Sequence, residues 1–278
     1  MKNRQIAHFD DMQYLLGSLL ETERRLVFGA EYVVAVPTDV TEVEKKAFYD
    51  LVFHSEAKAK SVRIVEKGLA DAIGFGMDVI GEKGIFVANF GSGTTELSVL
   101  SQGGMVMNRL LKIGGENFDT SIASLVRHNR EFLIGVLTAE KLRREFGVFD
   151  QSTDSSITVS GRDLVTGVPA QTDIPISLVR AAMKEPLEEC VKAIRSMIER
   201  TPPDVRRAIE KKGICLTGGM ANMRGLPTYL RESIGLPVMT ADEPELCVVK
   251  GLQKIISDRG YYRRLTYSML DEDYRWLR

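Results

Sequence analysis

The sequence contains few of the residues that build metal centres, disulfide frameworks or membrane spans. It has three cysteines and three histidines in 278 residues, and both kinds are widely separated. Isolated cysteines within apolar patterns are typical of buried thiols in a reducing compartment, whereas disulfide frameworks and zinc sites need paired spacing. No apolar run approaches the ~20 residues of a membrane-spanning helix, and no apolar core of a secretory signal follows the first residues. These absences predict a cytoplasmic protein.

An excess of charge of one sign is also missing. The chain has 37 Lys and Arg against 38 Asp and Glu, a formal net charge of −1. Nucleic-acid-binding proteins usually concentrate basic residues on one face or in one segment. We therefore expect no nucleic-acid partner.

Strands and helices are expected to alternate along the chain. Short apolar runs predict strands over residues 32–36, 62–65, 85–90, 96–101, 105–113, 214–217 and 236–239. A Thr-x-x-Glu capping box at Thr41 and Glu44 predicts the start of a helix. The polar stretch 152–173 is predicted to form strands with turns at Gly161 and Gly167. This alternation indicates an α/β fold.

Residues 85–96, IFVANFGSGTTE, carry the clearest functional signal. A buried apolar strand runs into a turn of small residues, and such a turn exposes consecutive backbone N–H groups that form a concave site for phosphate. Asn89 stands at the end of this strand, where a phosphate site that uses a metal usually has a carboxylate. The pattern predicts a nucleotide-phosphate site without the acid that metal-assisted chemistry needs.

Together, a set of ordered motifs resembles the actin-like ATPase superfamily and, within it, the MreB family of bacterial cell-shape proteins. The motifs are GSGTTE at 91–96, IGGENFD at 113–119, LIGVLTAEKLRREFG at 133–147, GRDLVTG at 161–167, ERTPP at 199–203, LTGGMANMRGL at 216–226 and EPELCVVKG at 243–251. The similarity extends from about residue 6 to residue 256. Because the motifs occur in the family's order, a chance match is excluded.

The resemblance implies an α/β chain with the actin-like, duplicated RNase H-like fold, in which the first half lacks its N-terminal strands. Residues 1–84 and 245–278 would form the remnant of the first half. Residues 85–116 and 187–244 would form the core of the second half, and residues 117–186 its inserted subdomain. The strand at 32–36 would then present an open apolar edge, for which a longer gene, a degenerate product or a partner that adds a strand are competing explanations.

The resemblance also implies ATP or ADP as a ligand in the cleft between the halves. The family's nucleotide motifs correspond here to Gly91, Ser92, Gly93, Thr94, Thr95, Glu140, Lys141, Leu142, Arg143, Gly218, Gly219, Met220, Ala221 and Asn222. These residues are the predicted nucleotide contacts.

Hydrolysis in the family uses acids at three places, and the sequence lacks each of them. An Asp-x-Gly-Thr turn near the family's start precedes the point at which this chain begins to match. Asn89 replaces the acid that helps to hold magnesium. The family's IEEPMAAAIG aligns with residues 65–74, which places Lys67 where the catalytic Glu is expected. A protonated lysine cannot accept a proton, so no catalytic residue and no bound Mg²⁺ are expected.

Two roles are open for Lys67. Its ammonium group could neutralise a bound phosphate directly, or it could be a solvated side chain at an abandoned cleft. Neighbouring Glu66 is expected to point away from the site and not to replace the missing acid.

Two surface segments suggest contacts with partners. Leu26, Val27 and Phe28 follow two arginines, and in MreB relatives this loop is apolar and touches the membrane; burial in the core is the alternative. The aromatic, arginine-rich segment from Arg259 to the C-terminus, which includes Trp276, either docks a partner or folds back over the first half.

The predicted function is that of an MreB-like cytoskeletal protein involved in cell-shape determination. It would bind nucleotide at most, with weak or no ATP hydrolysis, and act by assembly with itself or with MreB-type filament subunits. A peripheral position at the inner face of the plasma membrane is consistent with this role. The alternative is an active filament-forming ATPase whose true start lies upstream.

Overall fold

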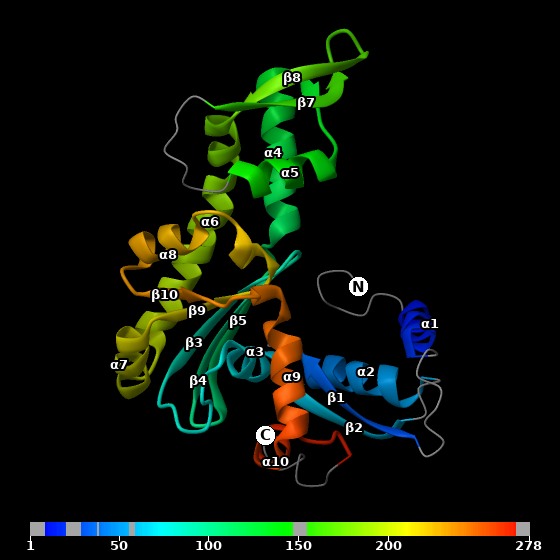
Figure 1. The fold of residues 1–278 in the computed structure, drawn as a ribbon, viewed down its shortest axis with the longest axis vertical. Helices are drawn as coiled ribbons and strands as arrows, with labels where there is room; N and C mark the ends of the chain where they lie inside the picture. The colour runs from blue at the N-terminus through cyan, green and yellow to red at the C-terminus, as the bar shows by residue number, and fades with distance from the viewer. Residues whose placement is uncertain (1–8, 21–28, 38, 56–58, 147–154, 271–278) are drawn as a thin grey trace.

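The computed structural model describes residues 9–20, 29–37, 39–55, 59–146 and 155–270, and its strands form three separate sheets (Figure 1). The residues expected to contact a membrane, Leu26, Val27 and Phe28, lie outside the described residues, as do Tyr274 and Trp276. Helices and strands alternate through the described part, as the apolar patterns predict.

The largest sheet has five strands in the order β10-β9-β3-β4-β5. Strands β3 (Ile85–Phe90), β4 (Thr95–Ser101) and β5 (Gly104–Leu111) form an antiparallel meander. Strand β9 (Ile214–Thr217) runs parallel to β3, and β10 (Val238–Thr240) runs parallel to β9. Every residue of β3 is buried, which explains its continuous apolar run.

The second sheet contains only β1 (Ala30–Val36) and β2 (Ala59–Glu66), which pair in parallel. Helix α2 (Glu42–Phe53) connects them, and the predicted capping box is present, with Thr41 and Glu44 bonded reciprocally. No strand precedes β1 among the described residues; only α1 (Phe9–Leu20) does. The far edge of β2 is bridged at Ile64 by Tyr267, through backbone hydrogen bonds of 2.7 and 3.0 Å.

A β-α-β-α unit occurs twice in the chain. The first copy is β1, α2, β2 and α3 (Lys67–Phe75), and the second is β9, α8 (Leu226–Ile234), β10 and α9 (Cys247–Ser257). The helices that end the two units, α3 and α9, cross with their backbones in close contact. A methyl group added at Gly74 would lie 1.7 Å from the Cys247 carbonyl oxygen, and one at Gly251 would lie 1.7 Å from that of Ala70.

A third sheet lies at one end of the molecule, over three helices (Figure 1). It contains β6 (Phe132–Leu133), β7 (Ser156–Asp163) and β8 (Pro169–Pro175). The helices are α4 (Gly115–Arg130), α5 (Val136–Phe146) and α6 (Ile176–Arg200).

The predicted turn at Gly161 is wrong. Gly161 lies inside β7, opposite Ala170, and an added Cβ would lie 2.4 Å from the Leu133 carbonyl oxygen. The glycine is therefore used for the close approach of β6 and not for chain reversal. Gly167, with φ of 74°, does lie in the turn between β7 and β8.

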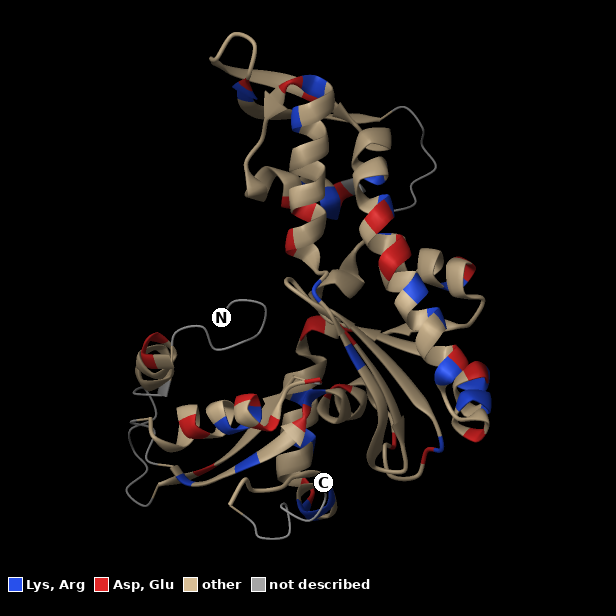
Figure 2. Ribbon diagram, turned by 180° about the vertical axis from the view of Figure 1, so that it is seen from behind, with Lys and Arg blue, Asp and Glu red and all other residues tan. Residues whose placement is uncertain are grey.

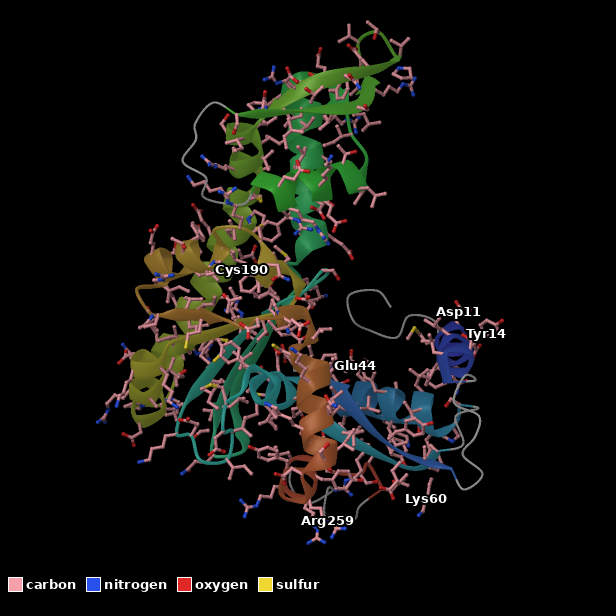
Figure 3. All side chains as sticks on the ribbon, in the orientation of Figure 1. Asp11, Tyr14, Glu44, Lys60, Cys190 and Arg259 are labelled. Atoms are coloured by element: carbon pink, nitrogen blue, oxygen red, sulfur yellow. The ribbon has the colours of Figure 1, made fainter. Side chains whose placement is uncertain are left out.

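Two apolar cores lie on opposite faces of the five-stranded sheet. Phe86, Ala88 and Phe90 point from β3 into the core that α4 and α6 cover, whereas Ile85 and Val87 point toward α3 and α9. Cys190, labelled on α6 in Figure 3, belongs to the first of these cores.

The remaining short elements complete the chain. They are α7 (Pro203–Lys212), the 3₁₀ turns η2 (Gly219–Asn222) and η3 (Pro244–Leu246), and α10 (Arg259–Leu265). Basic and acidic side chains are mixed along the helices (Figure 2). Among the described residues, no helix combines the length and apolar character needed to cross a bilayer.

Candidate functional site

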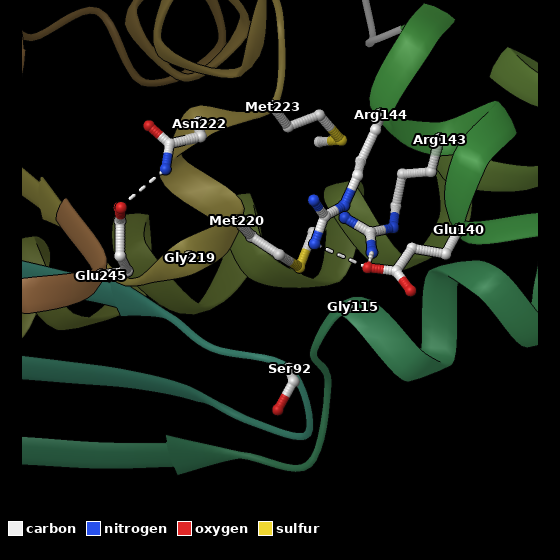
Figure 4. Close-up of a pocket in the computed structure, with 10 residues that line it drawn as sticks. All are labelled: Ser92, Gly115, Glu140, Arg143, Arg144, Gly219, Met220, Asn222, Met223 and Glu245. Atoms are coloured by element: carbon white, nitrogen blue, oxygen red, sulfur yellow. Dashed lines mark hydrogen bonds and ion pairs between the residues drawn. The ribbon is translucent and has the colours of Figure 1, made fainter. Parts of the chain in front are cut away.

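A cavity of about 440 Å³ lies where the five-stranded sheet meets α4, α5 and the two 3₁₀ turns (Figure 4). Its size is within the range of small-molecule sites. The residues that line it come from five sequence regions: Ser92, Gly115, Glu140, Arg143, Arg144, Gly219, Met220, Asn222, Met223 and Glu245.

The loop between β3 and β4 forms the floor of this region. It closes with a bond from the Gly91 N–H to the Thr94 carbonyl oxygen, 2.9 Å long. The first turn of α4 packs directly on the loop, since Gly115 and Glu116 donate their N–H groups to the carbonyls of Gly91 and Ser92 at 3.1 and 2.8 Å. The loop is therefore held rigidly in place before any ligand binds.

Thr94 has a polar atom that the protein does not use. The residue is fully buried, and its Oγ1 has no hydrogen-bond partner among the described residues. An unsatisfied buried hydroxyl costs about 1–3 kcal/mol, and such groups are usually bonded to a ligand or water.

Helix α5 brings charge to the opposite wall. The Arg143 Nε and Nη2 atoms donate to both carboxylate oxygens of Asp119 on α4, at 2.7 and 3.2 Å. Glu140 lies one turn earlier on α5 and pairs with Arg144 at 2.7 Å. The guanidinium of Arg143 thus has a fixed orientation at the pocket wall.

The third wall is the turn after β9. Gly218 has φ of 84°, and its backbone touches that of Phe90, so a side chain there is excluded. Asn222 donates to Glu245 at 2.8 Å and so links η2 to η3. The bonds that Glu245 accepts from its own backbone N–H and from Asn222 lower its pKa, so the carboxylate stays ionised at the rim.

Six of the predicted nucleotide contacts line this cavity: Ser92, Glu140, Arg143, Gly219, Met220 and Asn222. Of the other predicted contacts, Leu142 and Ala221 are buried in the apolar core. Thr95 directs its hydroxyl to the Ile113 carbonyl oxygen, and Lys141 points outward to Glu145. Gly91, Gly93, Thr94 and Gly218 shape the backbone next to the cavity without lining it.

Four lining residues were not predicted: Gly115, Arg144, Met223 and Glu245. Gly115 and Glu245 lie in motifs that the sequence does reveal, IGGENFD and EPELCVVKG. Arg144 follows Glu140 at the i+4 position, which is a signal for a helical ion pair. Met223 lies in the motif LTGGMANMRGL, one residue beyond the predicted contact Asn222.

Lys67 and Asn89 belong to a polar network beside the loop. The Lys67 Nζ donates to Glu96 Oε1 at 2.8 Å and to Asn89 Oδ1 at 3.1 Å. Asn89 in turn donates to Asp71 at 2.8 Å, and Thr217 donates to the same carboxylate oxygen at 2.7 Å. The Lys67 side chain is only 14% exposed, so the interpretation of a solvated lysine is wrong.

Glu66 points away from this network, as predicted. Its carboxylate accepts from Lys45 on α2 at 2.9 Å and from the Tyr267 hydroxyl at 3.2 Å. It therefore cannot supply the missing acid at the cavity.

A magnesium ion does not fit this arrangement. Asn89 Oδ1 and Glu96 Oε1, which lie beside the loop, both accept from the Lys67 ammonium group, and a dication there would be repelled by this positive charge. No cluster of three or more His, Cys, Asp or Glu side chains suited to a metal occurs in the described part of the chain.

Comparison with known proteins identifies the family. Residues 1–263 match the family described as MreB/Mbl protein. The chain belongs to this family. It is 37% identical over 255 residues to the cell shape-determining protein MreB of Escherichia coli (strain K12), covering 90% of this chain and 73% of that protein. The cell shape-determining protein Mbl of Bacillus subtilis (strain 168) is 31% identical over 254 residues, with 90% and 76% covered.

Solved structures confirm the actin-like fold of this MreB/Mbl family member. MreB5 of Spiroplasma citri bound to ADP superimposes with a TM-score of 0.87 at 27% identity, covering 92% of this chain and 78% of that one. The same protein bound to AMPPNP gives a TM-score of 0.86. The MamK double helical filament gives 0.76 at 16% identity, covering 93% and 80%, and this likeness concerns the fold alone.

Proposed function

We propose that this MreB/Mbl family member is a cytoskeletal protein that takes part in cell-shape determination and binds ATP or ADP in the cavity beside Ser92 without appreciable hydrolysis. The two MreB5 structures hold ADP and AMPPNP, and six of the predicted nucleotide contacts of this chain line the cavity. Bound nucleotide would hold the five-stranded sheet and the elements around α3 and α9 together. The protein would then act by assembling with copies of itself or with related subunits.

The absence of hydrolysis rests on one observation. The position expected to hold the catalytic acid carries the Lys67 ammonium group, which is fixed by Glu96 and Asn89. An ammonium group cannot remove a proton from an attacking water, and Glu66 faces α2. The site therefore supports binding and not turnover.

The test is a paired measurement on the purified protein. Nucleotide binding is followed by fluorescence of a labelled ATP analogue, and phosphate release is followed with excess Mg²⁺ over hours. We expect saturable binding with no phosphate release above the background of a control lacking protein. Release at a rate that increases with protein concentration would contradict the proposal and favour an active ATPase.

The halves and surfaces named from the sequence belong to the same proposal. Residues 1–84 with 245–278, 85–116 with 187–244, and the inserted 117–186 are proposed as the three parts. Peripheral membrane contact through Leu26, Val27 and Phe28 is tested by liposome co-sedimentation, in which Phe28→Asp should reduce the bound fraction. Equal binding of Phe28→Asp and the parent would contradict this contact.

A further inference from the structure

The ammonium group of Lys67 lies just below the phosphate loop. Asn89 and Glu96 are cross-strand partners in the β3–β4 hairpin, so their side chains lie on the same face of the sheet. The loop begins two residues beyond Asn89, which is about 7 Å along an antiparallel strand. Lys67 comes from the first turn of α3 and reaches across to both of these side chains.

The hydrogen bonds of Asn89 explain why an amide side chain is suited to this position beside Lys67. Its Nδ2 donates to Asp71 and to Thr217, and its Oδ1 accepts from Lys67. An aspartate at this position could not donate to Asp71 and would place a second negative charge against it. An amide at position 89 therefore fits a network in which the Lys67 ammonium group provides the positive charge.

The charges of this network determine which ligands can bind at the neighbouring loop. Lys67 contributes one positive charge, and Glu96 and Asp71 are the two carboxyl groups, both nearly buried. A polyphosphate on the loop would be repelled by these carboxylates if no cation stood between them. The ammonium group is a cation in that position, and it is bonded to Asn89 Oδ1 and Glu96 Oε1.

We propose that Lys67 is the resident cation of the phosphate site, so that nucleotide polyphosphate binds to this protein without a divalent metal. This inference rests on the nucleotide binding proposed above. Removal of the ammonium group takes away the positive charge 2.8 Å from Glu96, and the site then needs Mg²⁺ in solution to accept the same ligand.

The experiment compares nucleotide affinity in excess Mg²⁺ with affinity in EDTA. ADP and ATP are titrated into the parent protein, Lys67→Met, the double variant Lys67→Met/Glu96→Gln, and Lys45→Met as a matched control. Lys45 is also a largely buried lysine in an ion pair, but its partner is Glu66, away from the loop. Thermal unfolding verifies that each variant is folded.

The parent and Lys45→Met should bind equally well with and without the metal. Lys67→Met should lose about 10-fold or more in affinity in EDTA, equivalent to about 1.4 kcal/mol or more, and should recover with Mg²⁺. The double variant should bind independently of Mg²⁺ again, because the substitution at Glu96 removes the carboxylate that the ammonium group faced.

Three results would overturn the inference. If the parent itself loses 10-fold in EDTA, the metal and not Lys67 serves the site, while nucleotide binding stands. If Lys67→Met stays as insensitive to EDTA as the parent, the ammonium group has no such role. If no form binds either nucleotide in either condition, the proposed function fails as well. The parent measurement needs no substitution, so a 10-fold loss in EDTA overturns the inference even if a variant does not fold.

Discussion

At the residue scale, Arg143 shows how a charge is fixed at the wall of the cavity. Its guanidinium group is 8% exposed and pairs with Asp119, which is 5% exposed, through two hydrogen bonds. The geometry is bidentate, which is the strongest form of an arginine–carboxylate pair. Since the pair joins α4 to α5, it serves both the packing of these helices and the orientation of the arginine at the cavity.

Asp119→Ala should lower the free energy of unfolding by about 3–5 kcal/mol, because it leaves a buried guanidinium group without its counter-charge. Urea denaturation measures this change. Asp204→Ala is the control, since its pair with Arg207 is exposed on both sides and should change stability by less than about 1 kcal/mol. Equal effects of the two substitutions would contradict the role assigned to the buried pair.

The buried thiols make a second prediction at this scale. Burial raises the pKa of Cys190 and of Cys215 from about 9 to about 12. In the unfolded chain these thiols ionise near pH 9, while in the folded protein they keep their protons. The folded state therefore binds more protons between these values, and stability falls as pH rises through this window.

The free energy of unfolding should be insensitive to these thiols below pH 9 and decrease above it by about 1.4 kcal/mol per pH unit for each thiol. Urea titrations between pH 8 and pH 11 measure the slope, and Cys190→Ala should reduce it. The native protein at pH 8 should also resist a thiol reagent that labels all three cysteines in denaturant. Rapid labelling of the native protein would show that the thiols are accessible.

At the scale of elements, the crossing of α3 and α9 is the tightest constraint. Gly74 and Gly251 each lie where an added methyl group would be 1.7 Å from a backbone carbonyl of the other helix. No rotamer change relieves such a clash, because the opposing atom belongs to the backbone. The two β-α-β-α units can approach this closely only with glycine at both positions.

Gly251→Ala should therefore destabilise the protein by about 1–3 kcal/mol or more, although alanine is the better helix former. Gly135→Ala provides the control, since an added methyl group there meets no atom within 4 Å. The midpoints of thermal unfolding compare the two. A Gly251→Ala variant as stable as Gly135→Ala would contradict the close crossing.

The elements also show what the sequence can and cannot reveal. Capping residues and apolar runs are local, and they located α2, β3 and β9 to within a few residues. The pairing of Lys67 with Glu96 joins residues 29 apart through a side-chain contact, and no periodicity reports such a contact. Gly161 was misread because a glycine serves equally for a turn or for close packing, and only the position of β6 decides between them.

At the scale of the whole molecule, the five-stranded sheet is shared by two cores, while a third, smaller core lies on the two-stranded sheet, whose residue Val65 belongs to the second core. Alternate residues of β3 and β4 point into the two larger cores, so neither core can open without the other losing contacts. The third core lies between α2 and the two-stranded sheet, and among the described residues it contains six buried side chains: Val36, Phe48, Tyr49, Val52, Val62 and Ile64.

Amide hydrogen exchange should therefore be non-uniform. Amides of β1 and α2 should exchange at least about 10-fold faster than those of β3 and β4, because fewer buried contacts oppose local opening. Mass spectrometry of peptic peptides measures both regions in one experiment. Equal protection of the two regions would contradict the separation of the third core.

The Lys67 side chain differs from a bound ion in one further respect: it is encoded. A magnesium ion exchanges with the solution, so its presence at a protein varies with supply and can be abolished by a chelator. An ammonium group on a four-carbon stem has no dissociation equilibrium of its own. Its positive charge is therefore present in every copy of the protein, and only a mutation of the codon for Lys67 can remove it.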